Sequence, residues 1–180
     1  MFCRYDLFFS FSGNTCRFGC SNHSSGIPSN KTYLRRIELV EIRWTKGLDG
    51  FDEVYQVRKE VFIGEQDVPE ELEIDEIDPI ATHITLFENN IPVATGRLFG
   101  KNDKYYIGRV CVLSNSRGGG FGRLVMKELI NKGKHEGAIE IHLSSQIQAM
   151  DFYRKSGFCE YGEIHYDAGI THMWMRMCVA

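Results

Sequence analysis

The sequence predicts an α/β (α+β) fold in which a sheet of about seven strands is flanked by helices. Short segments with β-type alternation recur from about residue 37 onward, and segments with helical spacing interrupt them. A glycine-rich turn separates a strand at 105–113 from a helix, and another strand follows at 138–144. These two strands are therefore expected to be parallel neighbours joined by a right-handed crossover.

Composition places the chain among single-domain globular proteins. It has 180 residues, 43% of them hydrophobic, and a net charge of −3, which argues against a dedicated nucleic-acid binder. No apolar run approaches the roughly 18–20 residues of a membrane span, and the N-terminus does not resemble a signal peptide. A cytoplasmic protein that binds neither membrane nor nucleic acid is the expectation.

Two regions differ in composition. Residues 1–36 are rich in Ser, Asn and Gly without periodicity and are predicted to be a poorly ordered extension, and residues 37–180 form the folded domain. Cys16, Cys20 and His23 could suggest zinc, but only three ligands are visible and no second pair matches them. No metal is predicted.

The first elements of the domain precede an acidic tract. A strand is expected at 38–44 and a helix at 51–63. Residues 60–78 then contain nine carboxylates and no Lys or Arg, with apolar residues interleaved. This pattern predicts an ordered loop, pinned by apolar contacts, whose carboxylates point outward or into a cleft that would attract a cationic ligand such as an amine.

The remaining elements follow in order. Strands at 82–88 and 91–99 are joined by Asn89-Asn90, a good hairpin turn, and lead into the strand at 105–113. After the glycine-rich turn, a helix to about 133–137 and the strand at 138–144 precede a short helix at 146–156 and strands at 158–164 and 170–178. Three cysteines in these segments are expected to be buried free thiols: Cys111, Cys159 and Cys178.

The glycine-rich turn has the chemistry of an anion site. Its residues are Arg117, Gly118, Gly119, Gly120, Phe121, Gly122 and Arg123. Glycines allow close approach of the backbone, the following helix presents N–H groups at its positive end, and the arginines add charge. The alternative is a tight turn without a ligand. The GxxxxGK[ST] pattern of a P-loop is missing.

Two motifs together resemble the GNAT superfamily of acetyl-CoA-dependent N-acetyltransferases. The segment 117–122 is similar to its Arg/Gln-x-x-Gly-x-Gly/Ala pyrophosphate loop, and the segment 149–158 to its Ala-x-x-Phe-Tyr-x-Lys-x-Gly-Phe motif. Residues 61–71, together with Asp75, Asp78, His83 and 169–173, resemble the small bacterial ElaA-like branch, although Thr171 replaces a usual proline. The resemblance covers about residues 38–178.

The resemblance implies a mixed, mostly antiparallel seven-stranded sheet whose central parallel pair splays around coenzyme A. Backbone groups of Val110, Cys111 and Val112 would then pair with the pantetheine and the thioester, and N–H groups of 118–123 would cradle the pyrophosphate. The cofactor implied is acetyl-CoA, as co-substrate.

Catalytic roles follow from the same resemblance. Tyr153 is expected to protonate the departing thiolate, and the N–H of Val112 to stabilise the oxyanion. The general base stays open among Glu65, His83 and His172, because a lone histidine in a strand is more often structural and Glu65 could instead orient the substrate. No cysteine lies beside an evident base, so direct attack in a ternary complex is expected.

The predicted function is acetyl transfer to a primary amine: a small cationic amine, a polyamine or a lysine-like or peptide amine. The alternative is a non-catalytic acyl-CoA-binding sensor or interaction module. A homodimer is left open.

Overall fold

The computed structural model describes residues 40–101 and 104–179, so the expectation for residues 1–36 lies outside the described part of the chain. Seven strands form one sheet in the order β1-β2-β3-β4-β5-β7-β6. The β4–β5 pair is parallel and every other neighbouring pair is antiparallel. The predicted fold class is confirmed, including the parallel pair.

The first half of the sheet is an antiparallel meander. It comprises β1 (Val40–Lys46), β2 (Thr82–Glu88), β3 (Ile91–Lys101) and β4 (Lys104–Val112). Between β2 and β3, Asn89 and Asn90 both have positive φ, 52° and 64°, as a type I′ turn requires. The predicted hairpin is therefore confirmed together with the chemistry of its turn.

Between β1 and β2 the chain forms a helix with two geometries. It begins as α2 (Asp52–Arg58) and continues as the π-helical turn η1 (Lys59–Glu65), so the helix predicted at 51–63 is confirmed but its second half is wound differently. A 3₁₀ turn, η2 (Glu70–Leu72), follows within the acidic tract. Val54, Val57 and Val61 are buried against the sheet.

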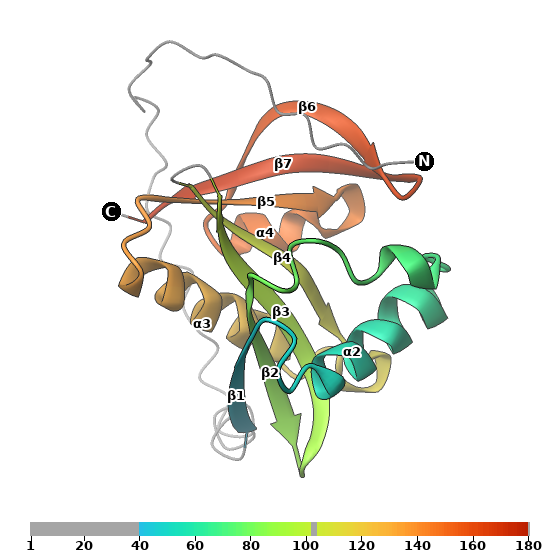
Figure 1. The fold of residues 1–180 in the computed structure, drawn as a ribbon. Coiled ribbons are helices and arrows are strands. Elements are labelled where there is room, and N and C mark those ends of the chain that lie inside the picture. The colour runs from blue at the N-terminus through green and yellow to red at the C-terminus, as the bar shows by residue number, and fades with distance from the viewer. Residues whose placement is uncertain (1–39, 102–103, 180) are drawn as a thin grey trace.

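The second half carries the crossover. After the 3₁₀ turn η3 (Ser114–Ser116) come α3 (Phe121–His135), β5 (Glu140–Gln146), the turn η4 (Ile147–Ala149), α4 (Met150–Lys155), β6 (Cys159–Asp167) and β7 (Ile170–Cys178). Figure 1 shows β5, β7 and β6 strongly inclined to β1, β2 and β3. The sheet therefore changes direction where β4 meets β5.

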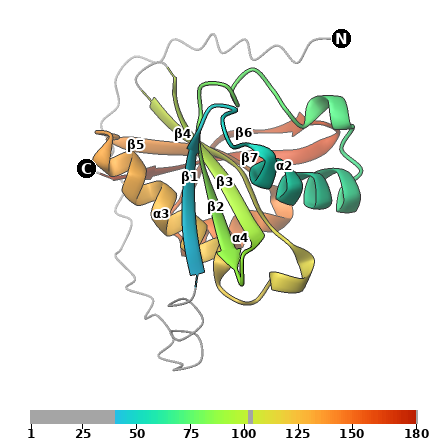
Figure 2. The same cartoon turned by 60° about the horizontal axis from the view of Figure 1, so that its bottom comes forward.

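Helices cover both faces of the sheet. In Figure 2, α3 and α2 lie on opposite sides of β1, β2 and β3. The larger core cluster joins α3 to the strands, with Val125 and Leu129 fully buried, and a smaller one joins Val57 and Val61 to Cys111 and Leu113. None of the helices in the described residues is long and apolar enough to cross a membrane.

The prediction for the cysteines is partly wrong. Cys111 is buried, as expected, but Cys159 and Cys178 are exposed. Cys159 begins β6, which is an edge strand, and Cys178 is the last residue of β7. Apolar neighbours in the sequence do not bury a residue at the edge or end of a sheet.

Candidate active site

The site lies where the parallel pair comes apart. β4 and β5 are paired only from Tyr105–Ile141 to Ile107–Leu143, and beyond this point no further register pairs join them. A cleft of about 960 Å³ opens there. Its lining combines the end of β4, the start of α3, the end of β5, α4, the β6–β7 turn and the segment 61–77.

A β-bulge sets the end of β4 apart from the rest of the strand. Arg97 pairs with Gly108 and Thr95 with Cys111, so Arg109 and Val110 stand opposite the single residue Gly96. Arg109 has a φ of +51°, a left-handed conformation that is uncommon for a non-glycine residue. Val110, Cys111 and Val112, at and after the bulge, line the cleft.

The direction of the Val112 N–H follows from the hydrogen bonds between β4 and β3. The N–H of Leu113 donates to the carbonyl of Val93 at 2.9 Å. Because neighbouring residues of a strand direct their N–H groups to opposite edges, the N–H of Val112 is directed away from β3, toward the side from which β5 has diverged. The predicted cofactor strand therefore presents main-chain groups to the cleft.

The glycine-rich turn leads into α3. Gly118 and Gly120 have φ values of +80° and +88°, and a Cβ at Gly118 would have no heavy atom within 4 Å. Gly122 lines the cleft, and a Cβ there would lie 3.4 Å from Phe152 and 3.6 Å from Val112. The ring of Phe121 is buried in the core. The turn thus presents main-chain groups rather than large side chains to the cleft. The N-terminal end of the 15-residue helix α3 follows directly.

Two polar bridges span the cleft. Arg117 donates through Nε to the carbonyl of Val112 at 3.0 Å and through Nη2 to Glu65 Oε2 at 2.5 Å. Gln146 Nε2 donates to Gln66 Oε1 at 2.9 Å. The end of η1 is thereby tied both to the turn before α3 and to the end of β5. The predicted residues Glu65 and Arg117 are brought together as an ion pair.

Tyr153 reaches the cleft from α4. Its ring is half-buried and contacts Phe152 and Phe158 edge-on, with centroid distances of 5.0 and 6.3 Å. Burial, with a smaller effect from Cys111, raises the pKa of the Tyr153 hydroxyl above its ordinary value. The hydroxyl is therefore protonated at neutral pH. Burial likewise raises the pKa of the Cys111 thiol, which is thus not a thiolate nucleophile.

The two candidate histidines lie in different places. His172 lines the cleft, and its Nδ1 lies 2.8 Å from the carbonyl of Ile170, which can only accept. In the neutral ring the lone pair is therefore on Nε2. His83 is fully buried beside Phe51 and is not part of the cleft lining. Burial lowers its pKa, so that its ring is neutral.

The acidic tract is ordered, but the expected reason is only partly right. Ile63, Val68 and Ile77 are half-buried, whereas Leu72 and Ile74 are 41% and 44% exposed, so apolar burial pins only part of this loop. Five of its nine carboxylates instead form ion pairs. These pairs are Glu65 with Arg117, Glu70 with Lys59, Glu73 with Arg58, Asp75 with Arg97, and Asp78 with both Arg58 and Arg97.

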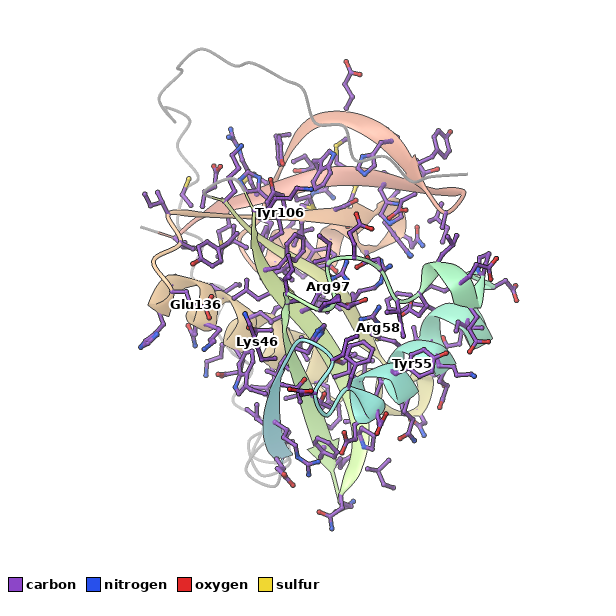
Figure 3. All side chains as sticks on the ribbon, in the orientation of Figure 1. Lys46, Tyr55, Arg58, Arg97, Tyr106 and Glu136 are labelled. Carbon is purple, nitrogen blue, oxygen red and sulfur yellow. The ribbon has the colours of Figure 1, made fainter. Side chains whose placement is uncertain are left out.

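At the centre of the loop's attachment is a buried ion network that we call the arginine network: Arg58, Arg97 and Arg109 with Glu73, Asp75 and Asp78. Arg58 and Asp78 have fully buried side chains, 2.8 Å apart. Figure 3 shows the labelled Arg58 and Arg97 between α2 and the central strands. Burial alone would raise the pKa of the Asp78 carboxyl, but the two arginines outweigh it and hold that pKa well below its ordinary value.

Sequence reasoning missed the three arginines. Arg58 lies in the apolar stripe of its helix, and Gly108-Arg109 interrupts an otherwise apolar strand. A cation in an apolar stripe and a glycine inside a strand are both signals of an unusual environment. Each arginine meets a carboxylate 15 to 36 positions distant in sequence, which explains why local patterns did not reveal the pairs.

Within residues 40–101 and 104–179, no group of three or more His, Cys, Asp or Glu side chains is arranged to hold a metal ion. The cysteines and histidine weighed for zinc, Cys16, Cys20 and His23, lie outside these ranges.

Comparisons with known proteins agree with this geometry. Residues 49–179 match the family model of the acetyltransferase (GNAT) domain. The uncharacterized N-acetyltransferase YjcF of Bacillus subtilis is 37% identical over 131 residues, covering 72% of this chain and 94% of that protein.

Solved structures share the architecture. The crystal structure of Escherichia coli ElaA has a TM-score of 0.68 and 26% identity, covering 77% of this chain and 99% of that one. A GNAT family acetyltransferase from Elizabethkingia anophelis, solved with acetyl-CoA bound, has a TM-score of 0.62 over 79% of this chain and 99% of that one. At 16% identity the second likeness concerns the fold alone.

Proposed function

The chain belongs to the GNAT acetyltransferase family, and from this premise we propose that it transfers the acetyl group of acetyl-CoA to a primary amine by direct attack in a ternary complex. The observation that carries the proposal is the N–H of Val112, directed into the gap that β5 leaves beside the glycine-rich turn. A main-chain donor aimed into a cleft next to an anion cradle suits a thioester attached to a pyrophosphate.

The residues of the glycine-rich turn fit coenzyme A because they have little side-chain bulk, so the cofactor can approach their main-chain groups. The N–H groups of 118–123 would hold the pyrophosphate, where Gly118 leaves open space and Gly122 allows close packing. Arg117, half exposed, would exchange part of its contact with Glu65 for a phosphate. Main-chain groups of Val110, Cys111 and Val112 would receive the pantetheine arm.

The chain's own residues supply the remaining chemistry. The amine nitrogen attacks the thioester carbon, the Val112 N–H donates to the developing oxyanion, and the C–S bond then breaks. Tyr153, whose raised pKa keeps it protonated, gives its proton to the leaving sulfur. The proton that the nitrogen loses after attack replaces the one that Tyr153 gave.

The proposed base is His172, which must first take a proton from the ammonium ion. Its Nε2 carries the lone pair because Nδ1 donates to the carbonyl of Ile170. Glu65 is paired with Arg117 and is better placed to position that arginine than to accept a proton. We propose no catalytic role for His83, since it lies outside the cleft lining.

Negative charge in the cleft supports a cationic acceptor, although less than the sequence suggested. The lining holds six acidic and four basic side chains. Glu71, Glu76 and Asp167 are the acidic ones without an ion pair among the described residues. They leave the cleft attractive to an ammonium ion.

Thiol release from acetyl-CoA in the presence of a panel of primary amines tests the proposal. Turnover that is lost in Tyr153→Phe, with calorimetric binding of acetyl-CoA retained, is the expected result. Tight binding of acetyl-CoA without turnover on any amine would contradict it and favour a non-catalytic sensor.

A further inference from the structure

The ion pair of Arg117 with Glu65 joins the two sides of the cleft beside the proposed thioester site. Arg117 Nη2 lies 2.5 Å from Glu65 Oε2, and Arg117 Nε donates to the carbonyl of Val112 at 3.0 Å. A single guanidinium group therefore separates the main chain of Val112 from the Glu65 carboxylate. In the free protein, a cation occupies the space between this carboxylate and the strand that would receive the thioester.

Acetyl-CoA would compete for both contacts of this guanidinium. Arg117 is the first residue of the glycine-rich turn, where the pyrophosphate would lie, and a phosphate is a bidentate partner for arginine. The carbonyl of Val112 belongs to the main chain that would receive the pantetheine arm. The side chains of Arg117 and Glu65 are 48% and 30% exposed, so solvent screens their pair and the arginine can exchange one partner for another.

Glu65 has contacts that would keep it in place after this exchange. Its neighbour Gln66 accepts a hydrogen bond from Gln146 Nε2 at 2.9 Å, which ties the end of η1 to the end of β5. The N–H of Val68 donates to the carbonyl of Phe62 at 3.0 Å and closes the chain around the end of η1. Neither bond involves the ion pair, so the carboxylate would remain in the cleft wall without it.

The proposed base lies at the same level of the sheet as this attachment. Gln146, which holds Gln66, is the register partner of His172 in β7. Cross-strand partners direct their side chains to the same face of a sheet, and the side chains of both residues line the cleft. Glu65 and His172 therefore border one part of the cleft from its two sides.

The other cations of the lining do not neutralise this part of the cleft. Two of the four basic side chains in the lining belong to the arginine network and are paired there. A third, Lys101, lies at the opposite end of β3 from Ala94, the register partner of Val112. Once Arg117 turns to a phosphate, Glu65 is a carboxylate without its cation, and it would attract an ammonium ion to the thioester site.

From these contacts we infer that Glu65 binds the ammonium group of the acceptor, and that bound acetyl-CoA makes this carboxylate available by drawing Arg117 away from it. This rests on the proposed function and specifies how the same site selects a cationic acceptor. In the free protein Arg117 occupies the position of the ammonium, and in the complex the acceptor replaces it. His172 then takes a proton from the ammonium that Glu65 holds, and the neutral nitrogen attacks the thioester.

Glu65→Gln tests the exchange because it should change two properties in opposite directions. The calorimetric affinity for acetyl-CoA should rise about threefold, because no ion pair has to be broken. The kcat/KM for ethylamine should fall about tenfold or more, because the ammonium loses its charged partner. Glu60→Gln, at an exposed position earlier in η1 and outside the cleft lining, should change neither. An affinity for acetyl-CoA that is unchanged or lower in Glu65→Gln would overturn the inference.

Repeating the substitution in an Arg117→Gln background separates its two effects. Without the arginine there is no ion pair to break, so Glu65→Gln should no longer raise the affinity for acetyl-CoA. It should still lower kcat/KM for ethylamine, because the carboxylate acts on the acceptor directly. A rise in affinity of the same size in both backgrounds would show that the exchange with Arg117 does not occur.

The charge of the acceptor gives the last test. Trifluoroethylamine is similar in shape to ethylamine but is mostly neutral at neutral pH, because its fluorine atoms withdraw electrons from the nitrogen. Glu65→Gln should therefore lower kcat/KM for ethylamine at least about fivefold more than for trifluoroethylamine. Equal losses for the two amines would overturn the inference and leave the proposed function intact, whereas no turnover of any primary amine by the wild type would contradict the proposed function itself.

Discussion

The two sides of the cleft differ in the groups that they present: main-chain atoms on one side and side chains on the other. On the side of the glycine-rich turn, the groups that face the cleft are mainly main-chain atoms of 110–112 and 118–122, and their side chains are small or packed into the core. On the opposite side, the segment 66–81 is held by the arginine network and presents side chains. One side depends on backbone conformation, and the other on charged groups from distant parts of the chain.

This difference separates cofactor recognition from acceptor recognition. A backbone cradle suits a pyrophosphate, which is the same in every acyl-CoA. A loop that is anchored to the sheet by buried ion pairs can accept substitutions of its exposed residues without losing its position. Substitutions on the side of the glycine-rich turn should therefore change cofactor binding and catalysis, whereas substitutions in the arginine network should change stability.

The largest effect is expected for the anchor of the acceptor side. Arg58→Met should lower the free energy of unfolding by about 3–5 kcal/mol, because it leaves Glu73 and Asp78 buried without their common partner. Urea denaturation measures this. Lys59→Met is the matched control: its pair with Glu70 is more than half exposed and screened by solvent, so its loss should change the unfolding free energy little. Equal losses in both variants would contradict the structural role of the network.

The next effect concerns catalysis on the cofactor side. Tyr153→Phe should lower kcat on the order of 100-fold, with little change in the calorimetric affinity for acetyl-CoA, because it removes the proton donor and keeps the ring. Tyr166→Phe, an exposed tyrosine outside the cleft lining, is the control and should be neutral. A loss of affinity that equals the loss of kcat would assign Tyr153 to packing.

Acid should weaken the acceptor side first. The pKa of Asp78 is lower in the folded protein than in the unfolded chain, so the unfolded state takes up its proton first as the pH falls. The contribution to stability is complete well above the unfolded pKa of about 3.9 and declines below it. The difference in unfolding free energy between wild type and Asp78→Asn should shrink by about 2 kcal/mol toward pH 2.

A control for this prediction is Asp49→Asn, at an exposed position in the turn between β1 and α2. Its effect on the unfolding free energy at pH 6 should be much smaller than that of Asp78→Asn, because Asp78 lies in buried ion pairs with Arg58 and Arg97. If Asp78→Asn showed a constant difference from wild type between pH 6 and pH 2, the ion pairs would not be the source of the acid sensitivity.

The smallest effect compares two glycines in the same conformation. Gly118 and Gly137 have φ values of +80° and +90°, and neither would place a Cβ within 4 Å of another atom. Alanine at either should cost about 1 kcal/mol of stability through backbone strain. Only Gly118→Ala should also raise KM for acetyl-CoA, about tenfold, because its methyl group occupies the proposed pyrophosphate cradle. A similar KM in both variants would place the cradle elsewhere.

Much of the fold was predictable because it depends on local patterns. Alternation predicted the strands, Asn89-Asn90 the hairpin, and the glycine-rich turn the start of α3. The π-helical turn at 59–65 was not predictable, since the apolar spacing that suggests an α-helix does not distinguish the two windings. The edge position of β6, which exposes Cys159, follows from strand order and not from the residues of β6.

The site was predictable to the extent that it is made of backbone. The glycines and the strand before them are contiguous in sequence, so the sequence alone could predict that together they form an anion site. The carboxylates of the acidic tract were visible, but their partners Arg58, Arg97 and Arg109 come from α2, β3 and β4. Local reasoning therefore took a largely neutralised loop for a free negative surface.

The short parallel pairing of β4 with β5 has a mechanical consequence. Only three register pairs join the two parts of the sheet, whereas six or more join each of the other neighbouring strands. This junction is the seam along which the sheet should open most readily, and amide hydrogens there should exchange sooner than those of β2 and β3. A molecule bound across the seam adds hydrogen bonds where the ladder ends. Such a molecule would hold the two parts of the sheet together and slow amide hydrogen exchange in both β4 and β5.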